Sequence, residues 1–321
     1  MKMLMHPTAR AMFLALAFFA SGSASADESL WVYAKGAETL PKGEFEFKLT
    51  SVSRLGKSSG SYSFHDIRPT VEYGLNDRLT LEASLLIFDH NYSVDDPDLQ
   101  PMFDSQGGEG GRYRHTQIGG YELFAKYNVL SPYKDVVGLA VGFAYERRQR
   151  YRLDGAPVSQ NSYVPSVYLQ KNFIENTLTF ALSTKMEMEL RHSPGVREEE
   201  IAFDIAAGVS YRVRPNWNIG LEFRHQSDYL CPEIDGACDP GEEESLQTSN
   251  FSLPDFRIGS QHQNGNYLGP SVHYSQQRWW ATAGLLFQIA GGGSRNAFVE
   301  GGKNWDEHER THFGLSFGYE F

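Results

Sequence analysis

The last ten residues of this 321-residue chain alternate between large apolar side chains and small or polar ones. The apolar positions are Phe313, Leu315, Phe317, Tyr319 and the C-terminal Phe321. Successive side chains of a β-strand point to opposite faces, so the segment predicts a strand with one apolar face. A soluble domain more often leaves its last residues frayed. An apolar strand at the very end of the chain therefore narrows the possible folds considerably.

The same alternation recurs along most of the chain, beginning with Phe45, Phe47 and Leu49. The links between these segments alternate in length. Short links fall at residues 75–78, 130–135, 174–177, 214–217 and 275–278, and long polar stretches fall at residues 89–112, 148–162, 191–199, 230–266 and 291–309. We therefore predict an all-β fold, a transmembrane antiparallel up-and-down β-barrel of about 12 strands with both termini periplasmic.

The N-terminal segment predicts export. Residues 1–10 carry Lys2 and Arg10 and no acidic residue, residues 11–20 form an apolar run, and Ala24-Ser25-Ala26 supplies small residues for cleavage. This is the pattern of a signal peptide over residues 1–26. The alternative, a helical anchor, needs roughly 20 apolar residues, more than this run provides. We expect residues 27–42 to be a lead-in, periplasmic or lumenal, and residues 43–321 to form the barrel.

The composition is compatible with a barrel, because only alternate residues face lipid and a mean hydropathy of -0.43 is then expected. A net charge of -11 argues against nucleic-acid binding. The C-terminal strand resembles the segment by which outer-membrane barrels are recognised for assembly. We therefore expect a monomer in the bacterial outer membrane, with its lipids, lipopolysaccharide and the barrel-assembly machinery as partners, and with no cofactor or metal.

Residues between the apolar positions would face the lumen, and they are unusually charged. The predicted lumen-lining residues are Lys48, Glu72, Glu82, Glu122, Lys126, Glu146, Arg148, Lys185, Glu187, Glu189, Asp204, Glu222 and Arg224. Buried charges have to be hydrated or paired. Two alternatives stay open, a cross-linked polar plug and a hydrated solute pathway. No ring of charges of a single sign indicates an ion filter.

The two cysteines, Cys231 and Cys238, lie close together in a polar stretch of an exported chain, which predicts a small loop disulfide. The same stretch contains Glu233, Asp235 and Asp239. Clustered carboxylates can bind calcium, but their spacing matches no calcium loop, and a solvated acidic surface is favoured.

His225 and Ser227 lie two residues apart near the outer end of a predicted strand, on its lipid-facing side. A histidine beside a serine hydroxyl can act as its general base if a third polar group orients the ring. This His-x-Ser resembles the motif of outer-membrane phospholipases and lipid A deacylases. In those families Asn-Gly tends to follow the serine, whereas Asp228-Tyr229 follows here, and only Glu199 or Glu200 suggests itself as a third member. We expect no enzyme activity and keep lipid hydrolysis as an alternative.

Two segments resemble a broad group of proteobacterial outer-membrane proteins, often labelled transporters or likened to an outer-membrane protein of phenol-degradation clusters. They are Gly36-Ala37-Glu38-Thr39-Leu40-Pro41-Lys42-Gly43-Glu44 and residues 69–79. The resemblance implies a channel or uptake route for small solutes, including hydrophobic or aromatic ones. A non-conducting surface barrel with ligand-binding loops is the other alternative.

Overall fold

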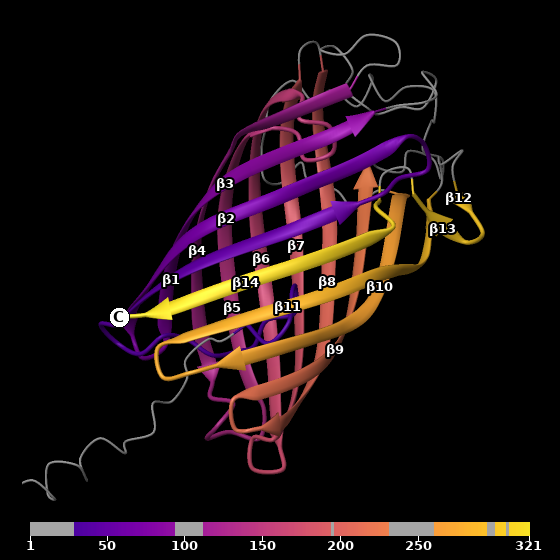
Figure 1. Cartoon of the computed structure of the whole chain (residues 1–321). Helices are drawn as coiled ribbons and strands as arrows, with labels where there is room; N and C mark the ends of the chain where they lie inside the picture. The colour runs from indigo at the N-terminus through magenta and orange to yellow at the C-terminus, as the bar shows by residue number, and fades with distance from the viewer. Residues whose placement is uncertain (1–28, 94–111, 194–195, 231–259, 294–298, 306–307) are drawn as a thin grey trace, which may run out of the picture.

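The computed structural model describes residues 29–93, 112–193, 196–230, 260–293, 299–305 and 308–321. Twelve strands pair antiparallel in one closed barrel, in the order β1-β14-β11-β10-β9-β8-β7-β6-β5-β4-β3-β2 (Figure 1). This confirms the predicted antiparallel up-and-down β-barrel of about 12 strands, while the periplasmic location of both termini stays a prediction. The strands are β1 (Phe45–Leu55), β2 (Ser61–Asn76), β3 (Leu79–Ser93), β4 (Arg112–Leu130), β5 (Gly138–Arg150), β6 (Pro157–Phe173), β7 (Leu178–Ser193), β8 (Val196–Arg214), β9 (Trp217–Leu230), β10 (Ser260–Ser275), β11 (Trp279–Gly293) and β14 (Thr311–Glu320).

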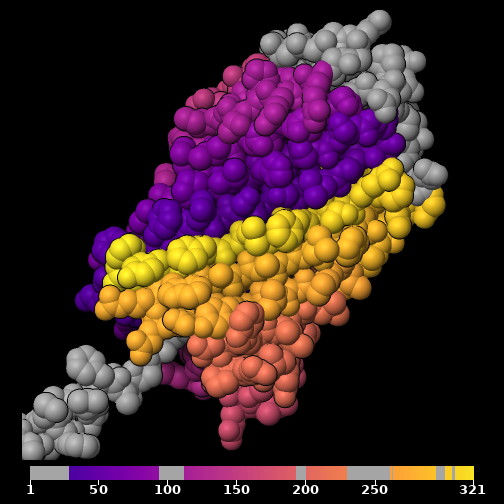
Figure 2. All heavy atoms as spheres, viewed as in Figure 1, coloured from indigo at the N-terminus to yellow at the C-terminus, as the bar shows by residue number. Residues whose placement is uncertain are grey.

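The first and last strands close the barrel. β14 pairs with β1 from Glu46↔Glu320 to Leu55↔Thr311 and with β11 on its other side. Figure 2 shows the yellow β14 as a band between the indigo first strands and the orange β11. Because both edges of β14 are paired, its backbone groups are satisfied without water, as a strand in lipid requires.

Apolar side chains cover the outside of the wall. Leu315 and Phe317 on the terminal strand are 46% and 41% exposed, and Leu221 on β9 is 53% exposed. The intervening side chains point inward and are buried. In the described part of the chain no helix is long and apolar enough to cross a membrane.

At the long-loop end of the barrel, the strands are longer than the alternation of apolar residues predicts. Residues 148–162 were expected to be a long connection, but β5 reaches Arg150 and β6 begins at Pro157, so only residues 151–156 connect them. Above the bilayer the outer face meets water, and the apolar signal disappears although the strand continues. The stretch 291–309 contains a small hairpin, β12 (Val299–Glu300) and β13 (Lys303–Asn304).

The register at the closure can be tested with a disulfide. Thr50 Oγ1 and Ser316 Oγ are 3.3 Å apart on register partners. In a Cys231→Ser/Cys238→Ser background, Thr50→Cys with Ser316→Cys should form a disulfide, and the denatured, unreduced chain should migrate faster in electrophoresis.

Thr50→Cys with Thr282→Cys is the control, because β11 lies one strand beyond β14. Two strand spacings are about 10 Å, too far for a disulfide. Equal cross-linking in both variants would contradict this register.

Candidate functional site

The lead-in lies inside the barrel. Trp31, Ala34, Ala37 and Leu40 are at most 2% exposed, and the first three pack against inward-facing residues of the wall. The Trp31 indole donates a hydrogen bond to Val209 O at 3.3 Å. Of the two places considered for this segment, the structure supports the lumen for residues 29–40. The predicted signal peptide lies outside the described residues.

Glu222 on β9 anchors the lead-in. Its carboxylate accepts the backbone N–H groups of Val32, Tyr33 and Ala34 at 3.0, 2.7 and 2.6 Å. Hydrogen bonds to an ionised acceptor are roughly twice as strong as neutral ones. The lead-in forms no strand ladder, so this carboxylate supplies the partners that its backbone needs.

Inward-facing glycines make room for the lead-in. A Cβ at Gly208 would overlap the Trp31 ring, and a Cβ at Gly284 or Gly314 would overlap the Val32 side chain. Gly284 and Gly314 are direct partners across the β11–β14 ladder. The inner surface of β11 and β14 therefore has no side chains where Val32 packs against it.

A chamber of about 300 Å³ lies between the lead-in and the long-loop end of the barrel. Its wall includes Val32 and Tyr33 of the lead-in, and Arg152 and Glu309 from the connections at the opposite end. The remaining charged residues of its wall are Lys35, Lys48, Arg54, Asp66, Arg68, Glu82, Glu122, Glu146, Arg148, Lys185, Glu187, Glu189, Glu200, Asp204, Arg224 and Asp228. Charges of both signs face the same space.

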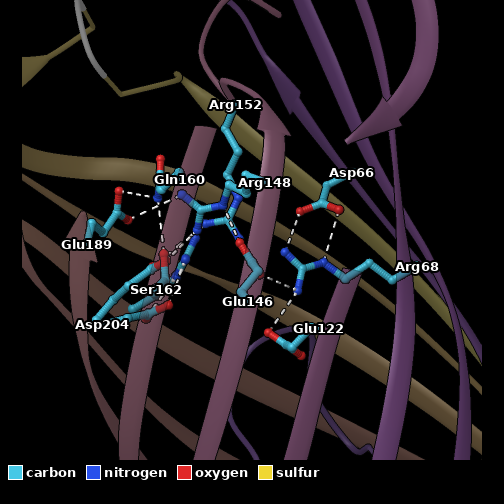
Figure 3. A network of polar contacts seen from close by, with 12 residues as sticks. Asp66, Arg68, Glu122, Glu146, Arg148, Arg152, Gln160, Ser162, Glu189 and Asp204 are labelled. Carbon is cyan, nitrogen blue, oxygen red and sulfur yellow. Dashed lines mark hydrogen bonds and ion pairs between the residues drawn. The ribbon is translucent and has the colours of Figure 1, made fainter. Parts of the chain in front are cut away.

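Arginines and carboxylates in this wall form a connected network (Figure 3). Glu146, 2% exposed, bonds to Arg148, to Arg152 at 3.0 Å and to Arg68 at 3.5 Å. Arg68 also reaches Asp66 at 2.9 Å. Such pairing offsets the cost of removing these charges from water.

The other predicted lumen residues are distributed around this network. Arg148 reaches Glu189 at 3.2 Å and Glu187 at 2.5 Å, and Arg224 reaches Asp204 at 2.8 Å. Lys48 pairs with Glu72, while the Lys126 ammonium lies 5.2 Å from the centre of the Tyr168 ring. Glu82, Glu122 and Lys185 line the chamber. The lumen therefore combines cross-linked charges with a chamber that these charges line.

The connection 151–156 folds over the chamber. Tyr62 donates its hydroxyl to Leu153 O at 2.7 Å, Tyr92 donates to Asp154 O at 3.0 Å, and His90 Nε2 bonds to Arg152 O at 2.9 Å. The connection lies against a buried cluster made by Tyr62, Phe64, Leu86, Phe88, Tyr92 and Tyr113. Aromatic residues at inward positions of the outer strand ends are the sequence signal for this cap.

A second cap comes from the residues before β14. Glu309 O accepts the Tyr267 hydroxyl at 3.0 Å, and the Glu309 carboxylate lies 3.7 Å from Lys57 Nζ and 3.2 Å from His312 Nε2. Burial alone would raise the pKa of Glu309, but Lys57 and His312 hold it below its usual value. His312 Nδ1 in turn bonds to the Tyr33 hydroxyl at 2.8 Å, which joins this cap to the lead-in.

His225 and Ser227 lie on the outward face of β9, and His225 Nε2 is 3.1 Å from Ser227 Oγ. The expectation that Glu200 could complete the group is wrong, because Glu200 lines the chamber on the other face of the sheet. The structure instead brings Asn266, which the sequence did not suggest, to His225 Nδ1 at 2.8 Å. Cys231, Cys238 and their acidic neighbours lie outside the described residues.

This geometry defines an outer-membrane type of β-barrel with a chamber between its lead-in and its long-loop connections. A family model described as a family of unknown function, DUF6662, matches residues 23–321, and the chain belongs to this family. No curated protein matches the sequence significantly. Membership of the transporter-like group stays a prediction.

The chain is similar to solved structures, and the outer membrane channel described first shows the same fold. The COG4313 outer membrane channel from Pseudomonas putida F1 is 12% identical, with a TM-score of 0.57 over 89% of this chain and 98% of that one. The translocator domain of the autotransporter NalP from Neisseria meningitidis is 12% identical, with a TM-score of 0.47 over 98% of this chain and 97% of that one. At this identity the likeness concerns the fold alone.

The charge network predicts a large stability loss when one partner is removed. Arg148→Met leaves three carboxylates around an uncharged side chain, and breaking such a buried pair costs about 3–5 kcal/mol. Urea unfolding in lipid vesicles measures this. Arg147→Met is the matched control, because Arg147 bonds Ser159 and Asn161 in the neighbouring strand, and its loss should cost at most about 1 kcal/mol. Equal losses would refute the role given to the network.

The cap over residues 151–156 predicts a pH effect. Burial raises the pKa of Asp154 from 3.8 to about 6. The backbone N–H of Ala156, which donates to the Asp154 carboxylate at 2.8 Å, acts in the opposite direction and lowers this pKa. The contribution of Asp154 to stability is therefore complete below pH 3.8 and lost as the pH rises through about 6.

Asp154→Asn keeps the acceptor for Ala156 and avoids this loss. It should raise the free energy of unfolding at pH 8 by at most about 3 kcal/mol and flatten its slope between pH 4 and 6. The control is Asp135→Asn, which also removes a carboxylate bonded to a backbone N–H, here that of Ser131 in an exposed turn. An unchanged slope in Asp154→Asn would contradict the prediction.

Proposed function

We propose that this protein is an outer-membrane uptake barrel that holds a small charged solute in its chamber and releases it past the lead-in. The chamber carries this proposal, since a space of about 300 Å³ lined by charges of both signs is suited to binding. A purely structural barrel has no need for such a space.

The wall of the chamber favours polar solutes over the hydrophobic or aromatic ones that the sequence suggested. Arg68, Arg152 and Arg224 offer planar donors that match carboxylates or phosphates. Glu82 and Glu187 offer acceptors to ammonium groups. A zwitterion or a small organic anion could form ion pairs with these residues. The ion pairs would replace the hydration that the solute loses when it enters the chamber.

The lead-in closes the pathway on the side of the short turns. β1 begins and β14 ends on this side, which we assign to the periplasm. Because Glu222 holds the backbone of residues 32–34, transport requires this anchor to be released. The lead-in is thus the proposed gate, and its position sets the conductance.

Conductance in planar bilayers tests the gate. Removal of residues 27–40 should open large, stable channels. Glu222→Gln turns one acceptor oxygen into a donor, and loss of a charge-assisted hydrogen bond should raise the open population by roughly 10- to 100-fold. Gly314→Leu should have the same direction of effect, because it displaces Val32 without changing a charge.

Glu82→Gln is the matched control, since Glu82 lines the chamber from β3 and its loss removes the same charge. It should leave the open population near that of the wild type. Swelling of liposomes in zwitterionic, anionic and neutral solutes then identifies the solute class. If the truncated barrel is folded but neither conducts nor admits solutes, the proposal fails.

A further inference from the structure

A polar cluster interrupts the apolar outer surface of β9 and β10. On β9, Ile219 and Leu221 are 52% and 53% exposed, and the same face then presents His225 and Ser227. On β10, Leu268 is exposed, and Asn266 and Asn264 follow on its face. The cluster thus begins where the apolar band ends.

The register of the two strands aligns the cluster. Asn266 is the partner of His225, and Asn264 is the partner of Ser227. His225 Nδ1 lies 2.8 Å from Asn266 Oδ1, and His225 Nε2 lies 3.1 Å from Ser227 Oγ. A serine, a histidine and an orienting group within these distances are the arrangement that activates a serine hydroxyl.

A chain of amide hydrogen bonds leads from the Tyr229 hydroxyl to Asn266. Gln261 Nε2 donates to the Tyr229 hydroxyl at 3.3 Å, Asn264 Nδ2 donates to Gln261 Oε1 at 3.0 Å, and Asn266 Nδ2 donates to Asn264 Oδ1 at 3.4 Å. Asn266 therefore presents its oxygen to His225. Since an amide oxygen only accepts, Nδ1 carries the imidazole proton and Nε2 is left to accept the serine proton.

We propose that Ser227, His225 and Asn266 form a serine hydrolase site for ester-linked acyl chains of membrane lipids. Ser227 Oγ attacks the ester carbonyl carbon while its proton passes to His225 Nε2. The ester C–O bond then breaks, and the leaving alcohol takes that proton. Water attacks the acyl-serine and gives a proton to Nε2, the bond from the acyl carbon to Oγ breaks, and Oγ regains the proton as the fatty acid leaves.

Asn264 is assigned to the oxyanion. Its Cα is paired with that of Ser227, and Nδ2 uses one of its two hydrogens for Gln261. A β-bulge interrupts the ladder between Gln261 and Gln263, next to this position. Bulges are over-represented beside active sites, where they redirect side chains.

The depth of the cluster indicates the substrate. Trp217, at the short-turn end of β9, marks one membrane interface. Ser227 is ten residues further along the same strand. At about 3.3 Å per residue and a tilt of roughly 40°, it lies about 25 Å higher, which is the height of the apolar band of such barrels. The ester groups of lipids lie at this boundary.

This site does not depend on the proposed transport, because it uses the opposite face of the wall from the chamber. Ser227 is 1% exposed, so the acyl ester must displace the side chains that cover it. The same burial limits the hydrolysis of esters dissolved in bulk water and favours a lipid that reaches Ser227 from the membrane.

A second pair in the same barrel provides a matched control. Ser53 Oγ and His65 Nδ1 are 2.7 Å apart on β1 and β2, again on the outward face near the long-loop end. Among the described residues the other ring nitrogen of His65 has no hydrogen-bond partner. Ser53→Ala therefore removes a His–Ser pair that lacks the orienting amide.

The test uses the full-length protein in mixed micelles. Release of fatty acid is followed by mass spectrometry from phosphatidylethanolamine, from lipopolysaccharide and from p-nitrophenyl palmitate, and a long-chain fluorophosphonate labels activated serines. Wild type and Ser53→Ala should hydrolyse at the same rate and be labelled at Ser227. Ser227→Ala should lose about 10³-fold or more and take no label.

Asn266 is a positioning residue, and its test is the pH profile. Asn266→Ala should lower kcat by about 10²-fold or more, whereas Asn266→Asp should restore much of it and move the acid limb to higher pH, because a carboxylate favours imidazolium.

The lipid that is cleaved identifies the source of the ester. A folded wild-type barrel with neither label nor hydrolysis would overturn the proposal, as would equal rates in wild type and Ser227→Ala.

Discussion

The pairing of β1 with β14 is the constraint on which the rest of this structure depends. An unpaired strand edge cannot persist in lipid, so the sheet has to close. Closure assigns each residue of every strand to an inner or an outer face. On β9 the consequence is direct, because Glu222 and Arg224 face the lumen while His225 and Ser227 face outward.

Inside the barrel, charged side chains whose burial would be costly if they were unpaired lie next to hydrogen-bond or ion-pair partners. Glu146 lies among three arginines, and Glu222 receives three backbone N–H groups of the lead-in. The two carboxylates solve the same desolvation problem in different ways. One ties the wall strands together, and the other holds a segment that is covalently attached but not part of the sheet. Only the second arrangement can be released without breaking the barrel.

The lead-in and one outer cap are physically connected. Tyr33 bonds His312, His312 bonds Glu309, and Glu309 lies beside Lys57. The Arg224 guanidinium stacks over the Tyr33 ring at 3.6 Å from its centre while pairing with Asp204. Under the proposed uptake function, a solute bound to Arg224 would compete with these contacts and thereby loosen the lead-in.

Alternation along the chain predicts the barrel and which charged residues face inward, because a period of two residues is a local property of each strand. Asp66 and Arg68 escaped notice, since the alternation in β2 is weak. The contact of Asn266 with His225, the fold of residues 151–156 over the aromatic cluster and the position of the lead-in came only from the tertiary structure. Each depends on the register between segments far apart in the chain, and register is set by closure and bulges rather than by local alternation.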